Sequence, residues 1–190
     1  FAQSNLMKAM FEAADYETTI AYAEKVLNTE KADSQVQSDA SIFIARASLK
    51  TDNLEKSKKA YKDVSEVATG ILKAEALYYE AYFKHLEKAY DASNKTVQIL
   101  ASQYASYKYW GIKGLILMAK NNHQLDDAFQ ATYILENILK NYDQYNDLQE
   151  EAKTYLALIK EEKNKEEKEE DIEEEAEETI EQEATETIEF

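Results

Sequence analysis

The sequence contains no cysteine, no proline and only three glycines among its 190 residues. Without cysteine there is neither a disulfide framework nor a thiolate metal site. Sheet proteins join their strands with turns rich in glycine and proline, so the scarcity of both argues against a sheet. No uncharged apolar run approaches the roughly 20 residues of a membrane-spanning helix, and we expect no membrane insertion. The first residue is Phe1 rather than methionine, which favours a fragment or a processed product.

The charge is distributed unevenly along the chain. The net charge is −16, but residues 161–190 carry sixteen acidic and three basic residues, whereas residues 1–160 carry 22 acidic and 19 basic residues. The body is therefore nearly balanced and the tail is a polyanion. Nucleic-acid binding needs a basic face that displaces counterions, so we expect no nucleic-acid partner. The abundance of Ala, Glu, Lys and Leu favours an all-α chain.

Four stretches share a pattern of small and large residues, although few of their letters agree. They are ADYETTIAYAEKVL at 14–27, DNLEKSKKAYKDVS at 52–65, KAYDASNKTVQILA at 88–101 and DDAFQATYILENIL at 126–139. The small sixth positions are Thr19, Ser57, Ser93 and Ala131, spaced by 38, 36 and 38 residues. Twelve residues earlier, in a second helical segment, stand Met7, Ala45, Ala81 and Ala119. Each unit is therefore expected to be two helices, because small residues allow such helices to approach closely.

Helix–turn–helix units with a period near 34 residues are typical of tetratricopeptide repeats, and this chain resembles that family over residues 3–142. It departs from the pattern in having longer units and no closing proline. The stretch YWGIKGLILMAKNNHQLDDAFQATYILENILKNY at 109–142 resembles, more narrowly, the last repeat of large bacterial cell-envelope proteins of this family. A capping helix and a charged tail follow that repeat in the family. DLQEEAKTYLALIKEE at 147–162 fits such a cap, because its apolar residues share one helical face.

The resemblance implies an all-α fold, a right-handed TPR-like superhelix (α-solenoid) of about four helical hairpins plus a C-terminal capping helix. The pattern predicts helices at about 3–13, 16–28, 35–50, 54–67, 71–86, 89–103, 107–123, 127–141 and 147–165. The repeat domain spans 1–163, with units at about 3–31, 35–68, 71–104 and 107–142 and the cap at 147–163. Residues 164–190 form an acidic low-complexity tail. We expect a frayed end of the cap helix followed by disorder there, or else a segment that folds on a partner.

Reactive side chains are few. His85 and His123 stand 38 residues apart near the ends of equivalent helices, but zinc needs further ligands that no spacing supplies. The pair Asp126-Asp127 falls where a helix begins, and acidic residues there stabilise the helix dipole. Neither a phosphate-binding glycine loop nor a hydrolase motif is present. We therefore expect no enzyme, no cofactor and no bound metal.

The family resemblance implies a scaffold or adaptor that binds a protein or peptide in a concave groove. An alternative within the same class is an envelope-assembly component, similar to the TPR lipoproteins that escort outer-membrane proteins. The family resemblance suggests the periplasm or cell envelope as the location and leaves the cytoplasm open. A remote alternative is an α-helical enzyme such as an α/α-barrel glycosidase, which needs a closed toroid and a much longer chain.

By the same resemblance, the first helix of each unit lines the groove. The predicted partner-binding residues are Lys8, Phe11, Arg46, Leu49, Tyr78, Tyr82, His85, Lys120 and His123. Their cations suit an acidic or carboxylate-ended peptide, with Arg46 as a bidentate clamp. The chain's own tail, ending in Ile188-Glu189-Phe190, is a candidate occupant. The competing interpretation is that these residues are solvated surface charges and core aromatics.

Overall fold

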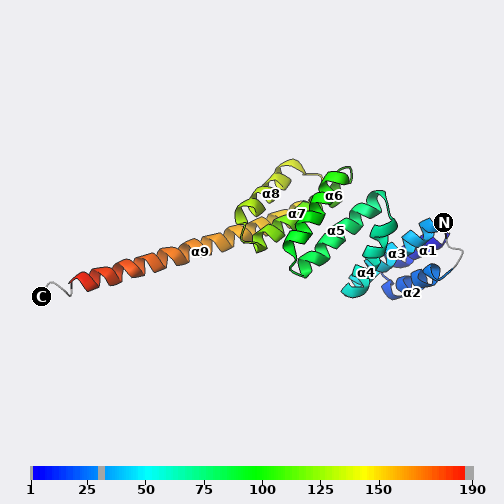
Figure 1. Ribbon diagram of the computed structural model, residues 1–190, viewed down its shortest axis with the longest axis horizontal. Coiled ribbons are helices and arrows are strands. Elements are labelled where there is room, and N and C mark those ends of the chain that lie inside the picture. The colour runs from blue at the N-terminus through cyan, green and yellow to red at the C-terminus, as the bar shows by residue number, and fades with distance from the viewer. Residues whose placement is uncertain (1, 30–32, 187–190) are drawn as a thin grey trace.

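The computed structural model describes residues 2–29 and 33–186. Within them the chain forms nine α-helices and no β-strand. The helices are α1 (Ala2–Glu12), α2 (Tyr16–Leu27), α3 (Ser34–Lys50), α4 (Leu54–Val67), α5 (Gly70–Leu86), α6 (Tyr90–Gln103), α7 (Lys108–Gln124), α8 (Ala128–Asn141) and α9 (Asn146–Glu186). Figure 1 shows them following one another as a row of hairpins, with α1 near one end and the distal part of α9 at the other. The expected all-helical, repeat-like architecture is thus confirmed, and the first eight helices begin and end within one residue of the expected positions.

The ninth helix corrects the expectation for the tail. α9 continues to Glu186, whereas we expected the cap helix to end near residue 165 and to give way to disorder. Glu, Lys and Ala favour helices, and the Lys165–Glu161 pair, at 2.9 Å, adds a stabilising contact one turn apart. Figure 1 shows the distal part of α9 running away from the other helices. The proposed occupant Ile188-Glu189-Phe190 lies outside the described residues.

Four hairpin turns repeat one backbone conformation. Their left-handed residues are Ala14, Asp52, Lys88 and Asp126, with φ of 58°, 56°, 59° and 61°. At the first turn, Ala14 N donates to Phe11 O and Asp15 N donates to Met10 O, both at 3.0 Å, and the other three turns repeat these two bonds. This is the Schellman ending of a helix. Asp15 then caps the next helix by accepting the backbone N–H of Thr18, so only residues 13–15 separate the two helices.

Glycine at one of these left-handed positions is expected to stabilise the protein. Ala14→Gly should raise the free energy of unfolding by about 0.5–1 kcal/mol, because alanine is strained at positive φ and glycine is not. The neighbouring change Ala13→Gly should lower stability, since Ala13 is not among the positive-φ residues. Urea unfolding of both variants measures the contrast, and a loss of stability in Ala14→Gly would contradict it.

The predicted small positions are all buried where the two helices of a unit meet. Thr19, Ser57, Ser93 and Ala131, together with Met7, Ala45, Ala81 and Ala119, are fully inaccessible to solvent. In two units the paired positions also share a hydrogen bond. Ser57 Oγ donates to Ala45 O at 2.9 Å, and Ser93 Oγ donates to Ala81 O at 2.7 Å. The twelve-residue spacing thus marks a direct contact between helices.

Enlarging a small position should disturb this contact. Ala131→Leu is expected to lower the free energy of unfolding by roughly 1–3 kcal/mol, because the added side chain overpacks the α7–α8 contact. The same change at the half-buried Gln130 should have little effect. Thermal melts that showed equal destabilisation by the two substitutions would contradict the assigned packing register.

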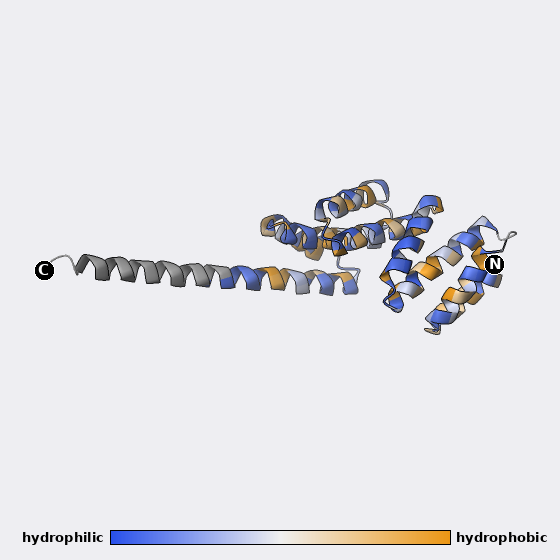
Figure 2. Cartoon of the chain, turned by 60° about the horizontal axis from the view of Figure 1, so that its bottom comes forward, coloured by the Kyte–Doolittle hydropathy of each residue, from blue (hydrophilic) through white to orange (hydrophobic). Residues whose placement is uncertain are grey.

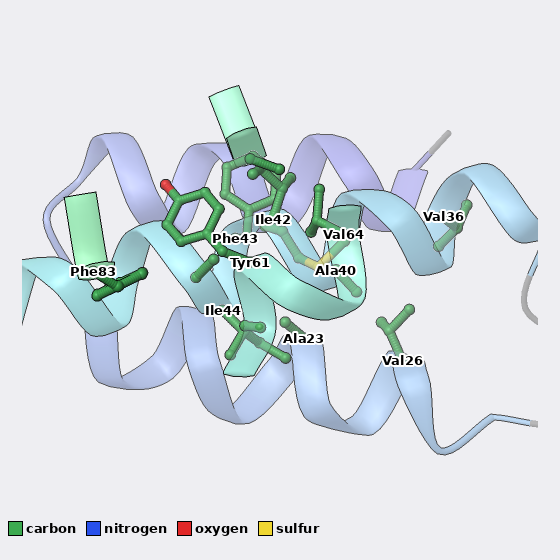
Figure 3. Close-up of a cluster of buried hydrophobic side chains, with 14 residues drawn as sticks. Ala23, Val26, Val36, Ala40, Ile42, Phe43, Ile44, Tyr61, Val64 and Phe83 are labelled. Atoms are coloured by element: carbon green, nitrogen blue, oxygen red, sulfur yellow. The ribbon is translucent and has the colours of Figure 1, made fainter. Parts of the chain in front are cut away.

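The core runs along the array as three linked clusters. The first joins α1–α4 to one side of α5 and surrounds the fully buried Tyr61 (Figure 3). The second lies between α5, α6 and α7, and the third between α7, α8 and α9. Figure 2 shows that the hairpin helices carry both hydrophobic and hydrophilic residues, so each buries one side. The backbones of α1 and α3 pack together, as do those of α5 and α7, and α4 packs against both α3 and α5.

Candidate functional site

A hollow of about 680 Å³ opens on the odd-numbered helices. All five of them, α1, α3, α5, α7 and α9, contribute to it, and no even-numbered helix lines it over the described residues. The lining residues are Phe11, Arg46, Leu49, Lys50, Glu75, Tyr78, Tyr79, Tyr82, Tyr109, Trp110, Lys113 and Glu151. We call this the aromatic hollow, because five of its side chains are Tyr or Trp.

The tyrosine-rich sequence of α5 supplies one wall. Tyr78 faces α7, where its ring lies 5.5 Å from Trp110. Tyr79 stacks on Tyr61 of α4 at 4.3 Å and also lies 6.0 Å from Trp110. Tyr82 extends the surface, 6.4 Å from Tyr78 and stacked on it. All three rings line the hollow, and Tyr79 also reaches the core through its contact with Tyr61.

Lys113 of α7 is held over this aromatic surface. Its Nζ lies 5.2 Å from the ring centre of Tyr78, 5.7 Å from that of Tyr109 and 5.8 Å from that of Trp110. A cation within about 6 Å of a ring face is attracted by the ring's quadrupole. Three rings therefore fix the position of one ammonium group at the wall of the hollow.

A buried ion pair crosses the gap between α3 and α5. Arg46 Nε donates to Glu75 Oε1 at 2.7 Å, and Arg46 Nη2 donates to Glu75 Oε2. Tyr61 Oη also donates to Glu75 Oε1, at 3.0 Å. Burial, followed by the charge of Glu75, raises the pKa of Tyr61 above its usual range. Arg46 therefore links α3 directly to α5, because its Nε and Nη2 both bond the carboxylate of Glu75.

A second set of polar contacts joins α7 to α9. Tyr109 Oη donates to Asp147 Oδ2 at 2.8 Å, and burial together with this hydrogen bond raises the pKa of Tyr109 to about 12. Lys120 Nζ pairs with Glu151 Oε1 at 2.6 Å. Further along, His123 lies 3.1 Å from Tyr155 Oη through Nδ1 and 3.1 Å from Glu162 Oε2 through Nε2. Acidic side chains of α9 thus contact polar groups of α7, both at the edge of the hollow and further along the helix.

The structure brings five of the nine sequence-predicted site residues into the aromatic hollow. These are Phe11, Arg46, Leu49, Tyr78 and Tyr82. The other four do not line it.

Those four residues contact other parts of the chain. Lys8 lies on the exposed side of α1 and pairs with Glu12 at 3.7 Å. His85 Nδ1 lies 2.7 Å from Oδ1 of the buried Asn121. Lys120 and His123 contact α9, as described above. Whether any of the nine binds a partner stays a prediction.

Sequence reasoning missed the residues that complete the hollow, among them Lys50, Trp110 and Lys113. A repeat signal was available for some of them. Glu75 and Lys113 each stand six residues before the small position of their helix, and Glu151 follows Lys113 by a further 38 residues. This row falls almost two helical turns before the small position, so it faces the same side of the array in successive odd-numbered helices.

A second hollow, of about 670 Å³, lies between α4 and α5. Its floor contains Tyr61 and Phe83, and its rim carries four lysines and four glutamates. Because these charges balance, the rim favours neither a positively nor a negatively charged ligand. The aromatic hollow is the better candidate, since more aromatic side chains line it and its positive and negative charges do not balance.

Comparison with known families finds no family model that matches the chain, and none of the curated proteins matches it. Within the described residues, no three His, Cys, Asp or Glu side chains gather as metal ligands would. None of the described helices combines the length and the apolar character needed to cross a bilayer. The assignment of function therefore depends on the hollow itself.

Proposed function

We propose that this chain is a non-enzymatic binding scaffold that holds a peptide or protein segment in the aromatic hollow. In this proposal the stacked hairpins form a right-handed TPR-like superhelix, and the odd-numbered helices line its concave groove. The repeated spacing of 36–38 residues, the buried small positions and the four equivalent turns support this description.

The observation that carries the proposal is the composition of the aromatic hollow. Ligand sites combine a large apolar surface with a few polar groups that orient the ligand. Tyrosine and tryptophan provide large contact areas with few rotatable bonds, and they are frequent at residues that dominate binding energy. Tyr78, Tyr82, Tyr109 and Trp110 form such a surface, and Lys50 and Lys113 border it.

A peptide-display selection tests the proposal. The protein is immobilised and challenged with a random-peptide library, and enriched peptides are then synthesised and titrated against it. Trp110 is the only tryptophan and lies in the hollow, so its fluorescence should respond to binding. Peptides that are enriched and change this fluorescence support the scaffold function; absence of enrichment contradicts it.

A matched pair of variants locates the binding surface. Tyr82→Ala removes a ring from the hollow, whereas Tyr133→Ala removes an exposed ring on α8, outside it. We expect only Tyr82→Ala to weaken binding of the selected peptides. Equal effects of the two substitutions would place the ligand elsewhere on the protein.

A further inference from the structure

Two of the cations that were predicted to bind a ligand already have carboxylate partners within the chain. Arg46 is engaged by Glu75, and Lys120 is engaged by Glu151. Glu75 and Glu151 are also the two carboxylates that line the aromatic hollow. Both negative charges of the hollow are therefore compensated before any ligand arrives.

Two lysines of the hollow differ from these cations. Among the described side chains, neither Lys50 nor Lys113 has a carboxylate within ion-pair distance. Lys50 is exposed at the end of α3, and Lys113 is held over three aromatic rings on α7. The charges of the hollow that remain for a ligand are thus two positive ones, Lys50 on α3 and Lys113 on α7.

We propose that the aromatic hollow recognises an acidic segment of a partner protein that also carries an apolar or aromatic side chain. Carboxylates of the segment pair with Lys50 and Lys113, while its apolar side chain lies on Tyr78, Tyr82 and Trp110. The inference rests on the proposed scaffold function and names the chemistry of its ligand. The ligand's carboxylates are thus bound by Lys50 and Lys113, and not by Arg46 and Lys120, whose charges are already compensated by Glu75 and Glu151.

The contact between α7 and α9 shows that this side of the array can hold acidic side chains. Asp147, Glu151 and Glu162 of α9 contact Tyr109, Lys120 and His123 of α7. Lys113 lies between these groups along α7 but has no such partner among the described residues. An acidic ligand in the hollow would add carboxylate contacts on the α5 and α3 side of those that α9 makes with α7.

Because the chain as a whole is negatively charged, a preference for acidic peptides would be clear evidence of a specific site. A chain of net charge −16 attracts basic peptides and repels acidic ones without any specific site. Selection of acidic peptides must therefore come from local groups that overcome this field. The distal part of α9 in the same molecule runs away from the other helices (Figure 1), so the ligand segment belongs to another molecule.

The test uses four synthetic peptides of equal length, titrated onto the full chain with Trp110 fluorescence as the readout. One is acidic with phenylalanines, one basic with phenylalanines, one uncharged with phenylalanines, and one acidic without aromatics. We expect the acidic peptide with phenylalanines to bind roughly tenfold or more tightly than the other three, and added salt to weaken it.

Charge-reversal variants connect this preference to the two lysines. Lys50→Glu and Lys113→Glu should each weaken the acidic peptide by roughly tenfold, whereas Lys62→Glu, on the exposed face of α4, should change it less than about twofold. Lys113→Met keeps the aliphatic stem over the rings and removes only the charge, so it serves if Lys113→Glu does not fold. It should also weaken binding.

The outcomes separate the inference from the function on which it rests. If display selection yields ligands but they are basic or uncharged, or if both lysine reversals leave binding unchanged, the acidic-ligand inference is wrong and the scaffold function stands. If neither the selection nor the four peptides gives any binding, the scaffold function itself fails.

Discussion

Arg46→Ala is expected to lower the free energy of unfolding by about 3 kcal/mol, because it leaves the carboxylate of Glu75 buried without its partner. The Glu75 side chain is 3% exposed. This loss of stability lies at the lower end of the range expected when one partner of a buried ion pair is removed, because the Arg46 side chain is 34% exposed to solvent. Lys50→Ala, one helical turn away and exposed, should change stability by less than about 0.5 kcal/mol. Urea unfolding of the two variants measures the difference.

A double variant tests the physical cause of that loss. Arg46→Met combined with Glu75→Gln removes both charges and keeps a carbonyl acceptor for the hydroxyl of Tyr61. It should be more stable than Arg46→Met alone, because no uncompensated charge remains in the core. A double variant as unstable as the single one would show that the packing of Arg46, and not its charge, holds α3 to α5.

Alkaline pH is expected to unfold the protein through its buried tyrosines. Burial is the main cause that raises the pKa of Tyr61 and Tyr78 above the usual value of about 10. Because the folded pKa lies above the unfolded one, these groups stabilise the fold below about pH 10, and the stabilisation is lost as pH rises beyond it. Each tyrosine that stays protonated in the fold removes roughly 1.4 kcal/mol of stability per pH unit, so the two together remove about 5 kcal/mol by about pH 12.

Circular dichroism and tyrosinate absorbance followed together against pH measure this transition. Loss of helix should coincide with a cooperative rise in absorbance by the buried tyrosines. Tyr78→Phe should move the midpoint to higher pH, because one titrating group is removed, whereas Tyr133→Phe, exposed on α8, should leave it in place. Tyrosinate absorbance that rises fully while the helices remain intact would contradict the assignment.

Helix positions could be predicted from the sequence because local chemistry decides them. The small residues recur with the repeat, and Asp15, Asn53 and Asp127 provide caps at the starts of three helices. The same turns place Lys88 in a left-handed conformation that its side chain gives no reason to expect. That conformation is set by the packing of the two helices that the turn connects.

The charge pairs could not be predicted in the same way. Arg46 and Glu75 are 29 residues apart, and their contact depends on how the packing of the array places α3 and α5 relative to each other. Sequence reasoning therefore treated Arg46 as a free clamp. The row that contains Glu75, Lys113 and Glu151 was visible in the repeat spacing. The effect of the opposite charges in that row depends on which side chains each residue contacts, and the repeat spacing does not reveal those contacts.

The tail shows a case in which two sequence properties compete. Its low complexity and its acidic charge predict disorder, because such a segment cannot bury a core. Its Glu, Lys and Ala residues also favour helix, and that propensity prevails as far as Glu186 in the structure. Composition gave no means of ranking the two, since neither depends on a tertiary contact.

The path of α9 makes the molecule strongly asymmetric in both shape and charge. Residues 163–186 lie beyond Glu162, the contact with His123, and would extend about 36 Å at 1.5 Å per residue. They carry thirteen acidic and three basic residues, while the helical body is almost neutral. The molecule thus has a large electric dipole moment along its long axis and should orient in an applied field. In solution it should tumble anisotropically and elute from a sizing column ahead of compact proteins of equal mass.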